Sequence, residues 1–439
     1  MTAPADAVRE SHWDRSVKAL IAGTFLSTAG HLAGVTALGK LVFDLTGREL
    51  DLGLIGLAEF LPVLLLVLLA GSVADRVDRR LICGVGALVS AAVAAALAAY
   101  AGSSPSAVLP IFALVVVTGI AAAFVSPASR ALPADILAPE DLPWLVARHS
   151  ATWQLALIVG PVLGGTLYAV DPSAPFVAMT VLYLLSALAY PIIRIRPRNS
   201  PAEAEMAAVI DEEGDEPTRA GLHHALEGLR FIRRRPILLG AISLDLFAVL
   251  FGGAVALLPA ITEDRLGVGA VGLGWLRAAG GIGAGAVTLV LTQKPVVRRI
   301  GRTLLTAVAV FGVATIALGV TTSYWVAFAA MLVLSGADAI SVFIRATLVP
   351  LVVPQEMRGR VLAVENVFIG GSNELGAFES GVAGQILGPA GAVVLGGAAT
   401  VAIAGTWAFA FPALRDIDRF PGSAQPVERD VIILDELGP

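Results

Sequence analysis

Two long apolar runs, 52–70 and 81–100, enclose a short polar and cationic segment, GSVADRVDRR (71–80). Each run has about 20 residues, the length that an α-helix needs to cross the hydrocarbon core of a bilayer. Lipid offers no partner to unpaired backbone groups, so both runs are predicted to be helices. A short turn rich in arginine is typical of the cytoplasmic face of a membrane. This segment therefore predicts a membrane protein that crosses the bilayer repeatedly.

The composition of the whole chain agrees with a bilayer as its solvent. Of the 439 residues, 56% are hydrophobic and only 15% are charged, whereas a soluble domain carries about 25% charged residues. The formal net charge of −5 gives no sign of a nucleic-acid partner. The single cysteine, Cys83, excludes a disulfide within the chain and a cysteine-based metal site.

The apolar runs divide the chain into two halves. About twelve runs are long enough to cross a membrane, six on each side of a hydrophilic stretch at 195–236. Lysine and arginine gather in every second loop, so the positive-inside rule places both termini in the cytoplasm. Within the hydrophilic stretch, 221–235 is predicted to be an amphipathic helix whose apolar side chains face the membrane. The expected organisation is a cytoplasmic N-terminal tail (1–16), a six-helix bundle (17–193), a cytoplasmic linker (194–236), a second six-helix bundle (237–413) and a cytoplasmic C-terminal tail (414–439).

The two halves also resemble each other in sequence. The segment RALP at 130–133 recurs as RATL at 345–348, each following the fourth span of its half. Glu59 and Arg277 hold matching positions in the second spans. Parallel repeats of six spans place a binding site near the midplane, between the halves. This architecture indicates a transporter that works by alternating access.

With these features the chain resembles the major facilitator superfamily, and within it the branch that includes the enterobactin exporter and macrolide efflux pumps. The loop at 71–80 is similar to the superfamily signature between spans two and three, although Asp78 stands where glycine is usual. The fifth span is similar to the signature of drug and solute antiporters, with Ala156 in place of its first glycine. The motif residues are Gly71, Asp75, Arg76, Arg79 and Arg80 in the loop, Gly160, Pro161, Gly164 and Gly165 in the fifth span, and EGLRFIRRRP (227–236) before the seventh span.

The resemblance implies an all-α membrane protein with the major facilitator fold, twelve transmembrane helices in two six-helix bundles and both termini in the cytoplasm. It also implies that Asp75 caps the start of span eleven, near Arg360, and latches the cytoplasmic side closed. Arg76 and Arg79 would brace Asp75, and Gly71 and Arg80 belong to the same latch. The alternative is a basic loop that only fixes topology. The fifth-span motif is either a hinge between the halves or ordinary tight packing.

Ionisable side chains inside the spans are candidates for proton coupling, because they are expensive in lipid. Asp245 lies deep in the seventh span and is the first candidate; Glu374 in span eleven is the second. Arg277 is expected to be a counter-charge, and Glu59 completes the set. The alternative for all of them is a set of static ion pairs between helices.

Six further side chains are candidates for the substrate cavity. The polar ones could form hydrogen bonds with a substrate, and the aromatic ones could stack on its rings. For each of them, packing or contact with lipid is the alternative. They are His31, Gln154, Asn366, Asn373, Phe247 and Phe251.

These features predict a secondary active transporter of the bacterial cytoplasmic (inner) membrane that exports a small amphipathic or aromatic molecule by proton antiport. The resemblance alone suggests a siderophore or a drug as substrate. A proton-coupled importer or a lipid transporter of the same fold is the alternative, and a transporter-like sensor or scaffold is a more distant one. The chain lacks the motifs GxxxxGK[ST], HExxH and G-x-S-x-G, so neither an enzyme, a cofactor nor a metal is expected. The expected partners are the substrate, protons and the lipid bilayer, without nucleic acid, and a monomer is expected.

Overall fold

The computed structural model of the chain describes residues 13–138, 140–196 and 217–421, with the side chains of 68, 75 and 217–225 left out. Nearly all of these residues are helical. The first half consists of α2 (Arg15–Thr46), α3 (Glu49–Arg76), α4 (Arg79–Gly102), α5 (Leu109–Ile136), α6 (Leu142–Val170), α7 (Ala174–Ala189) and η1 (Tyr190–Ile192). After α9 (Pro217–Arg234), the second half consists of α10 (Pro236–Phe251), η3 (Ala254–Leu257), α11 (Leu258–Asp264), α12 (Gly269–Gln293), α13 (Ile300–Val320), α14 (Tyr324–Val352), α15 (Gln355–Ala410) and α16 (Pro412–Arg415).

Helix α15 contains two crossings of the membrane. Among the described residues, 11 helical segments are long and apolar enough to span a bilayer. One of them, α15, has 56 residues, and at 1.5 Å per residue it is far longer than the roughly 30 Å of a hydrocarbon core. Gly388 interrupts it with φ 75° and ψ 160°, a conformation that is open mainly to glycine, and Pro389 follows. The break separates the two predicted last spans, so the predicted two-bundle, all-helical fold is confirmed.

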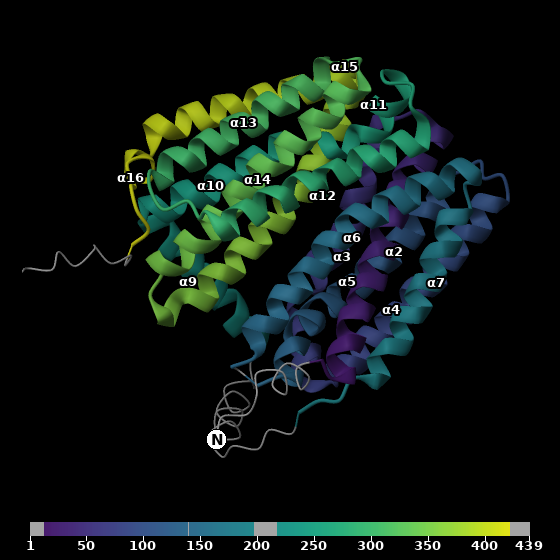
Figure 1. Cartoon of the computed structure of the whole chain (residues 1–439), viewed down its shortest axis with the longest axis horizontal. Coiled ribbons are helices and arrows are strands. Elements are labelled where there is room, and N and C mark those ends of the chain that lie inside the picture. The colour runs from purple at the N-terminus through teal and green to yellow at the C-terminus, as the bar shows by residue number, and fades with distance from the viewer. Residues whose placement is uncertain (1–12, 139, 197–216, 422–439) are drawn as a thin grey trace, which may run out of the picture.

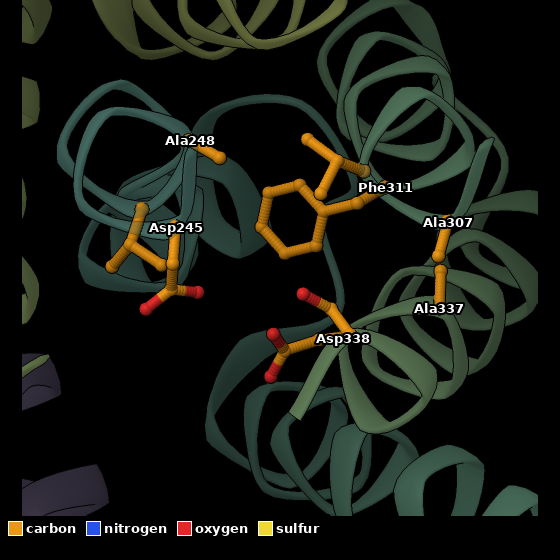
Figure 2. Close-up of a pocket in the computed structure, with 9 residues that line it drawn as sticks. Asp245, Ala248, Ala307, Phe311, Ala337 and Asp338 are labelled. Carbon is orange, nitrogen blue, oxygen red and sulfur yellow. The ribbon is translucent and has the colours of Figure 1, made fainter. Parts of the chain in front are cut away.

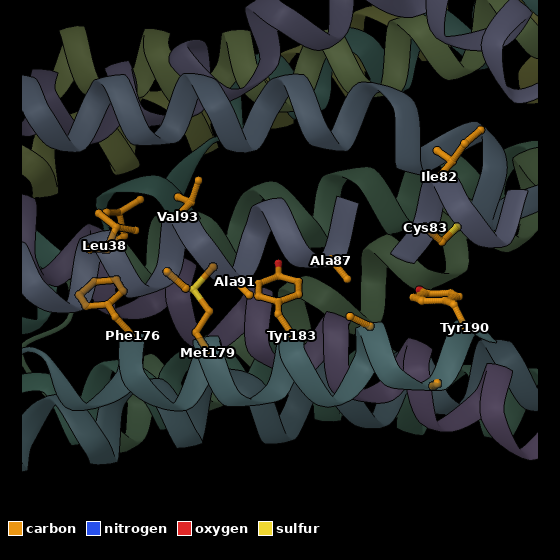
Figure 3. Packing of buried hydrophobic residues seen from close by; sticks show 14 of the residues in the cluster. Leu38, Ile82, Cys83, Ala87, Ala91, Val93, Phe176, Met179, Tyr183 and Tyr190 are labelled. Atoms are coloured by element: carbon orange, nitrogen blue, oxygen red, sulfur yellow. The ribbon is translucent and has the colours of Figure 1, made fainter. Parts of the chain in front are cut away.

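The interior of the first bundle depends on small residues that face large ones. Figure 3 shows Tyr183 of α7 packed toward α4 beside Ala87 and Ala91, with Phe176 about two turns away along α7. These four side chains are all less than 9% exposed. Cys83 is buried in the same cluster and acts there as a small apolar residue.

The two bundles converge at one end of the molecule and diverge at the other, as the purple-to-blue and green-to-yellow ribbons of Figure 1 show. We call the end that carries Arg15, Arg76 and Arg415 the basic end. The opposite end, which carries Gly47 and α11, is the distal end. That the basic end lies in the cytoplasm remains a prediction.

The bundles meet through glycines near the distal end. A Cβ on Gly381 of α15 would lie 3.0 Å from the Cα of Gly53 in α3, and one on Gly274 of α12 would lie 2.6 Å from the carbonyl oxygen of Pro161 in α6. Helix backbones therefore touch across the boundary without side chains between them.

The prediction that the apolar side chains of 221–235 face the membrane is wrong for part of this helix. Ile232 of α9 is only 1% exposed and packs with Leu238 and Val361 of the second bundle, and Phe231 lies against the same cluster. Leu226, in contrast, is 54% exposed. One face of α9 is therefore bound to the protein, and another remains open.

Candidate functional site

A cluster of charged side chains lies inside the second bundle. Nη2 of Arg345 in α14 is 2.6 Å from Oδ1 of Asp245 in α10, and both side chains are less than 9% exposed. Nη1 of Arg345 lies 3.9 Å from Oε1 of Glu365 in α15. Asp338, two turns earlier in α14, interacts electrostatically with both Asp245 and Arg345. Two carboxyl groups thus pair with one guanidinium, and the carboxyl group of Asp338 lies in the same cluster.

A small cavity separates two of these carboxyl groups. It has a volume of about 10 Å³ and lies between α10, α13 and α14. Figure 2 shows the carboxyl groups of Asp245 and Asp338 on its border, with the ring of Phe311 as an apolar wall. This space fits about one water molecule, whereas a drug-sized ligand needs roughly 300–1,000 Å³. The cavity therefore has no room for a substrate.

The expectation that Arg277 is the counter-charge of Asp245 is wrong, because Arg345 takes that position. Arg277 lies in α12 next to Gly39 of α2. Its Nε atom is buried, with no hydrogen-bond partner among the described residues. The internal repeat in the sequence contains Arg345 but suggests a loop position for it. In the structure α14 continues to Val352, which puts Arg345 about two turns inside the helix.

A second group of ionisable side chains lies between the two bundles. Nε2 of His31 in α2 is 3.9 Å from Oε1 of Glu59 in α3. Glu374 of α15 interacts electrostatically with Glu59, and its carboxylate fills the space that a Cβ on Gly56 would need. We call His31, Glu59 and Glu374 the midplane trio. The sequence predicts separate roles for these residues, and the structure brings them together.

The midplane trio is accessible to solvent although its members lie deep within their helices. The side chain of His31 is 37% exposed and that of Glu59 is 27% exposed. His31 is near the middle of α2, about 24 Å from either end. Since ionisable groups in spans face a water-filled space rather than lipid, the trio identifies the region between the bundles as the candidate path for substrate and protons.

The arginine-rich turn between α3 and α4 is held by two carboxylates. Nη1 of Arg79 lies 2.8 Å from both carboxylate oxygens of Asp135 at the end of α5. Asp78, the departure from the superfamily pattern, accepts a hydrogen bond from the backbone N–H of Arg80 at 2.9 Å and so caps α4. The hydrogen-bonded Arg80 guanidinium holds the pKa of Asp78 below its ordinary value of 3.8.

The structure does not test the predicted latch at Asp75. The side chain of Asp75 lies outside the described residues, and Arg76 is exposed. A Cβ on Gly71 would meet nothing within 4 Å. Arg360, the expected start of the latched helix, pairs with Glu227 of α9 at 2.5 Å. The latch at Asp75 therefore stays a prediction.

The glycine motif of α6 lies where this helix contacts helices of both bundles. A Cβ on Gly160 would lie 2.8 Å from the carbonyl oxygen of Ala29 in α2, and one on Gly164 would lie 2.8 Å from the Cα of Ala33. A Cβ on Gly165 would instead lie 2.8 Å from the Cα of Gly274 in α12. The predicted hinge thus lies at the boundary between the bundles, while its motion stays a prediction.

The remaining cavity candidates do not form one site. Nε2 of Gln154 donates to the carbonyl oxygen of Gly281 across the bundle boundary at 2.6 Å. Nδ2 of Asn373 donates to the carbonyl oxygen of Ile369 in its own helix at 2.8 Å. Phe247 packs edge-on against Trp407 with 5.6 Å between ring centroids. Asn366 is exposed and Phe251 is half-buried. In the described part of the chain, no hydrogen bond or ion pair joins these five residues to the midplane trio.

Comparison with known proteins gives matches over most of the chain. The model of the Major Facilitator Superfamily matches residues 20–377. The multidrug efflux pump Tap of Mycolicibacterium fortuitum is 28% identical over 413 residues, which are 89% of this chain and 95% of the relative. Tap of Mycobacterium tuberculosis (strain ATCC 25618 / H37Rv) is 27% identical over 429 residues, 92% of this chain and 97% of the relative.

Solved structures give the same fold at low sequence identity. A POT family transporter in complex with 5-aminolevulinic acid superposes with a TM-score of 0.71 at 10% identity, covering 91% of this chain and 96% of the other. A bacterial homologue of the human lysosomal transporter Spinster, inward-facing and unoccupied, superposes with a TM-score of 0.67 at 15% identity, covering 91% and 95%.

Proposed function

The chain belongs to the major facilitator superfamily, and from this premise we propose that it is a proton-coupled drug exporter of the bacterial cytoplasmic membrane. Members of the superfamily carry small molecules across membranes and are not enzymes. The observation that carries the proposal is the similarity to the Tap multidrug efflux pumps, which extends over about nine-tenths of this chain.

The chemistry of the midplane trio favours a drug over a catecholate siderophore. The trio brings two carboxyl groups, Glu59 and Glu374, to the region between the bundles. Carboxylates attract cationic molecules and repel anions. A siderophore remains the second candidate, because the sequence resembles the branch that contains the enterobactin exporter.

Proton coupling is proposed to use the two groups of carboxyl side chains. Protonation of Asp245 would neutralise its charge and weaken the contact with Arg345, which joins α10 to α14. Glu374 lies in the path between the bundles, where a drug and a proton would compete for the same carboxylate. If the basic end is cytoplasmic, the bundles diverge toward the cytoplasm and the described conformation would admit the drug from that side.

The test is transport into inside-out proteoliposomes with an acidic lumen. A lipophilic cationic drug and a catecholate siderophore are offered in parallel, and a protonophore collapses the gradient in a control sample. We expect the drug, and not the siderophore, to accumulate only while the gradient is present. Accumulation of the siderophore alone would select the second candidate. Drug accumulation that is indifferent to the protonophore would contradict proton antiport.

The same experiment distinguishes an exporter from an importer, a lipid transporter and a sensor. A proton-coupled importer would accumulate substrate only when the gradient is reversed, with the acidic side outside the vesicle. A lipid transporter would leave both compounds outside and change the distribution of a labelled lipid between the leaflets. A sensor or scaffold would show no transport in either orientation.

A further inference from the structure

Helix α9 presents an open face that carries three arginines. Five residues form this face, and they lie on one side of the helix because their spacing along the chain is i, i+3, i+4, i+7 and i+8. They line a surface hollow of about 400 Å³. The arginine side chains are exposed, and one leucine is 54% exposed beside them. This arginine face consists of Leu226, Leu229, Arg230, Arg233 and Arg234; Leu229 lies at its edge, half-buried against the second bundle.

The other side of α9 fixes the direction in which the arginine face points. Glu227 pairs with Arg360 at the start of α15, with 2.5 Å between Oε2 and Nη1. A Cβ on Gly228 would lie 2.7 Å from the carbonyl oxygen of Arg360, so the two backbones are in contact. Ile232 is almost fully buried against the second bundle. The helix is therefore anchored through this side and cannot turn its arginines toward the protein.

The arginines of this face have no acidic partner among the described residues. Other arginines at the basic end do have one: Nε of Arg298 lies 3.7 Å from Asp418, and Nε of Arg419 lies 3.8 Å from the same carboxylate. No ion pair of this kind involves the arginine face in the part of the chain that the structure describes. Three guanidinium groups are thus available to an anion from outside.

The position of the face indicates which anion it meets. Helix α10 begins at Pro236, so the arginines lie within about two turns of a membrane-spanning helix, at the depth of lipid headgroups. A guanidinium binds a phosphate through two parallel hydrogen bonds. The exposed Leu226 can contact the acyl chains of a lipid. A soluble phosphate has no such chains.

We propose that the arginine face of α9 is a binding site for the phosphate group of anionic phospholipids at the basic end. The neighbouring acidic run at 211–216 (DEEGDE), outside the described residues, is the competing occupant. An acidic peptide would satisfy the arginines but offers nothing to Leu226, and for this reason the lipid is favoured.

The experiment is native mass spectrometry of the purified full-length protein with phosphatidylglycerol or phosphatidylcholine added. We expect the wild type to retain phosphatidylglycerol in preference. In the variant Arg230→Gln/Arg233→Gln/Arg234→Gln, the apparent affinity for this lipid should fall about fivefold for each arginine lost. The lysine variant Arg230→Lys/Arg233→Lys/Arg234→Lys keeps the charge and should keep most of the preference, which guards against misfolding as the cause. Inorganic phosphate at the same concentration should not displace the lipid.

A matched control carries the same change of charge elsewhere at the basic end. The variant Arg298→Gln/Arg302→Gln/Arg419→Gln removes three arginines that already face Asp416 or Asp418, and it should bind phosphatidylglycerol like the wild type. An equal loss in both glutamine variants would overturn the proposal in favour of a bulk charge effect. The proposal would also fail if the protein preferred phosphatidylglycerol only after the acidic run at 211–216 is neutralised. The linker would then be the occupant of the arginine face.

Discussion

The ammonium group of Lys40 lies 3.1 Å from a carboxylate oxygen of Glu263, and this ion pair joins α2 of the first bundle to α11 of the second. The side chain of Lys40 is only 8% exposed. Asp44 also contacts Lys40 and accepts a hydrogen bond from the hydroxyl group of Tyr168 at 2.8 Å. In the proposed alternating-access cycle the distal end opens, and this pair would then break in every cycle.

Replacing Lys40 should therefore favour the state in which the distal end is open. For Lys40→Met we expect the distal-open population to rise about fivefold, because a partly exposed ion pair contributes about 1 kcal/mol. Spin labels at positions 48 and 264, both exposed, report the distance across the distal end in a Cys83→Ser background. Lys40→Arg keeps the charge and should give the wild-type distance distribution. An unchanged distribution in Lys40→Met would show that the pair does not hold the distal end closed.

Replacing Asp245 tests its proposed role in proton coupling. Asparagine keeps the shape of the side chain but cannot carry the charge that pairs with Arg345. We expect Asp245→Asn to lower gradient-driven drug accumulation at least about tenfold. Drug exchange without a gradient serves as the control, since it needs substrate binding and bundle movement but no net proton transfer. If accumulation survives and its pH profile is unchanged, Asp245 is only a structural ion-pair partner.

Two arginines of the second bundle, the buried Arg345 and the half-buried Arg277, should differ in their effect on stability. Arg345→Gln leaves Asp245 and Glu365 without their cation, and breaking a buried pair in this way costs about 3–5 kcal/mol. Arg277→Gln removes a guanidinium whose Nε has no hydrogen-bond partner among the described residues, and it should leave stability unchanged or raise it. Thermal unfolding of both variants in detergent gives the comparison. A larger loss in Arg277→Gln would show that the Arg277 guanidinium stabilises the fold more than the buried ion pairs of Arg345 do.

A methyl group at the bundle boundary should disturb the closed distal end. In Gly165→Ala the new Cβ would lie 2.8 Å from the Cα of Gly274 in the other bundle. Because a helix backbone must move to make room, we expect the free energy of unfolding to fall by about 1–3 kcal/mol. The same spin labels should show the distal end parted. Gly405→Ala is the control, because its Cβ meets nothing within 4 Å, and it should gain up to about 1 kcal/mol from helix propensity. Equal effects at both positions would argue against a boundary contact.

The cap of α4 should make stability depend on pH in the acidic range. Asp78→Ala removes the hydrogen bond to the N–H of Arg80, and we expect a loss of about 1 kcal/mol or less at pH 7. Because the folded-state pKa of Asp78 lies below its ordinary value of 3.8, the stabilisation is complete above that value and is lost as the pH falls through the lowered pKa. Unfolding temperatures of wild type and variant should thus converge in strong acid. A difference that stays constant with pH would contradict this origin.

The sequence predicts the fold well because bilayer thickness dictates the length of each apolar run. Even the break inside α15 at Gly388 falls between two predicted spans. Partners between helices are harder to predict, because a helix that is apolar all round does not reveal which side faces its neighbour. Thus the sequence points to Arg277 as the counter-charge where the structure has Arg345. The sequence also identifies His31, Glu59 and Glu374 as separate candidates, but its periodicity cannot show that they lie close together in the fold.

The glycine contacts at the distal end, such as Gly53 with Gly381 and Gly165 with Gly274, have a consequence for the kinetics of opening. Two bare backbones that touch have no side chains to unlock, so they separate without any change of rotamer. Their cohesion comes from dispersion forces, which fade within a fraction of an ångström. The distal end should therefore detach abruptly rather than stretch, so that the molecule passes between two discrete states and spends little time half open.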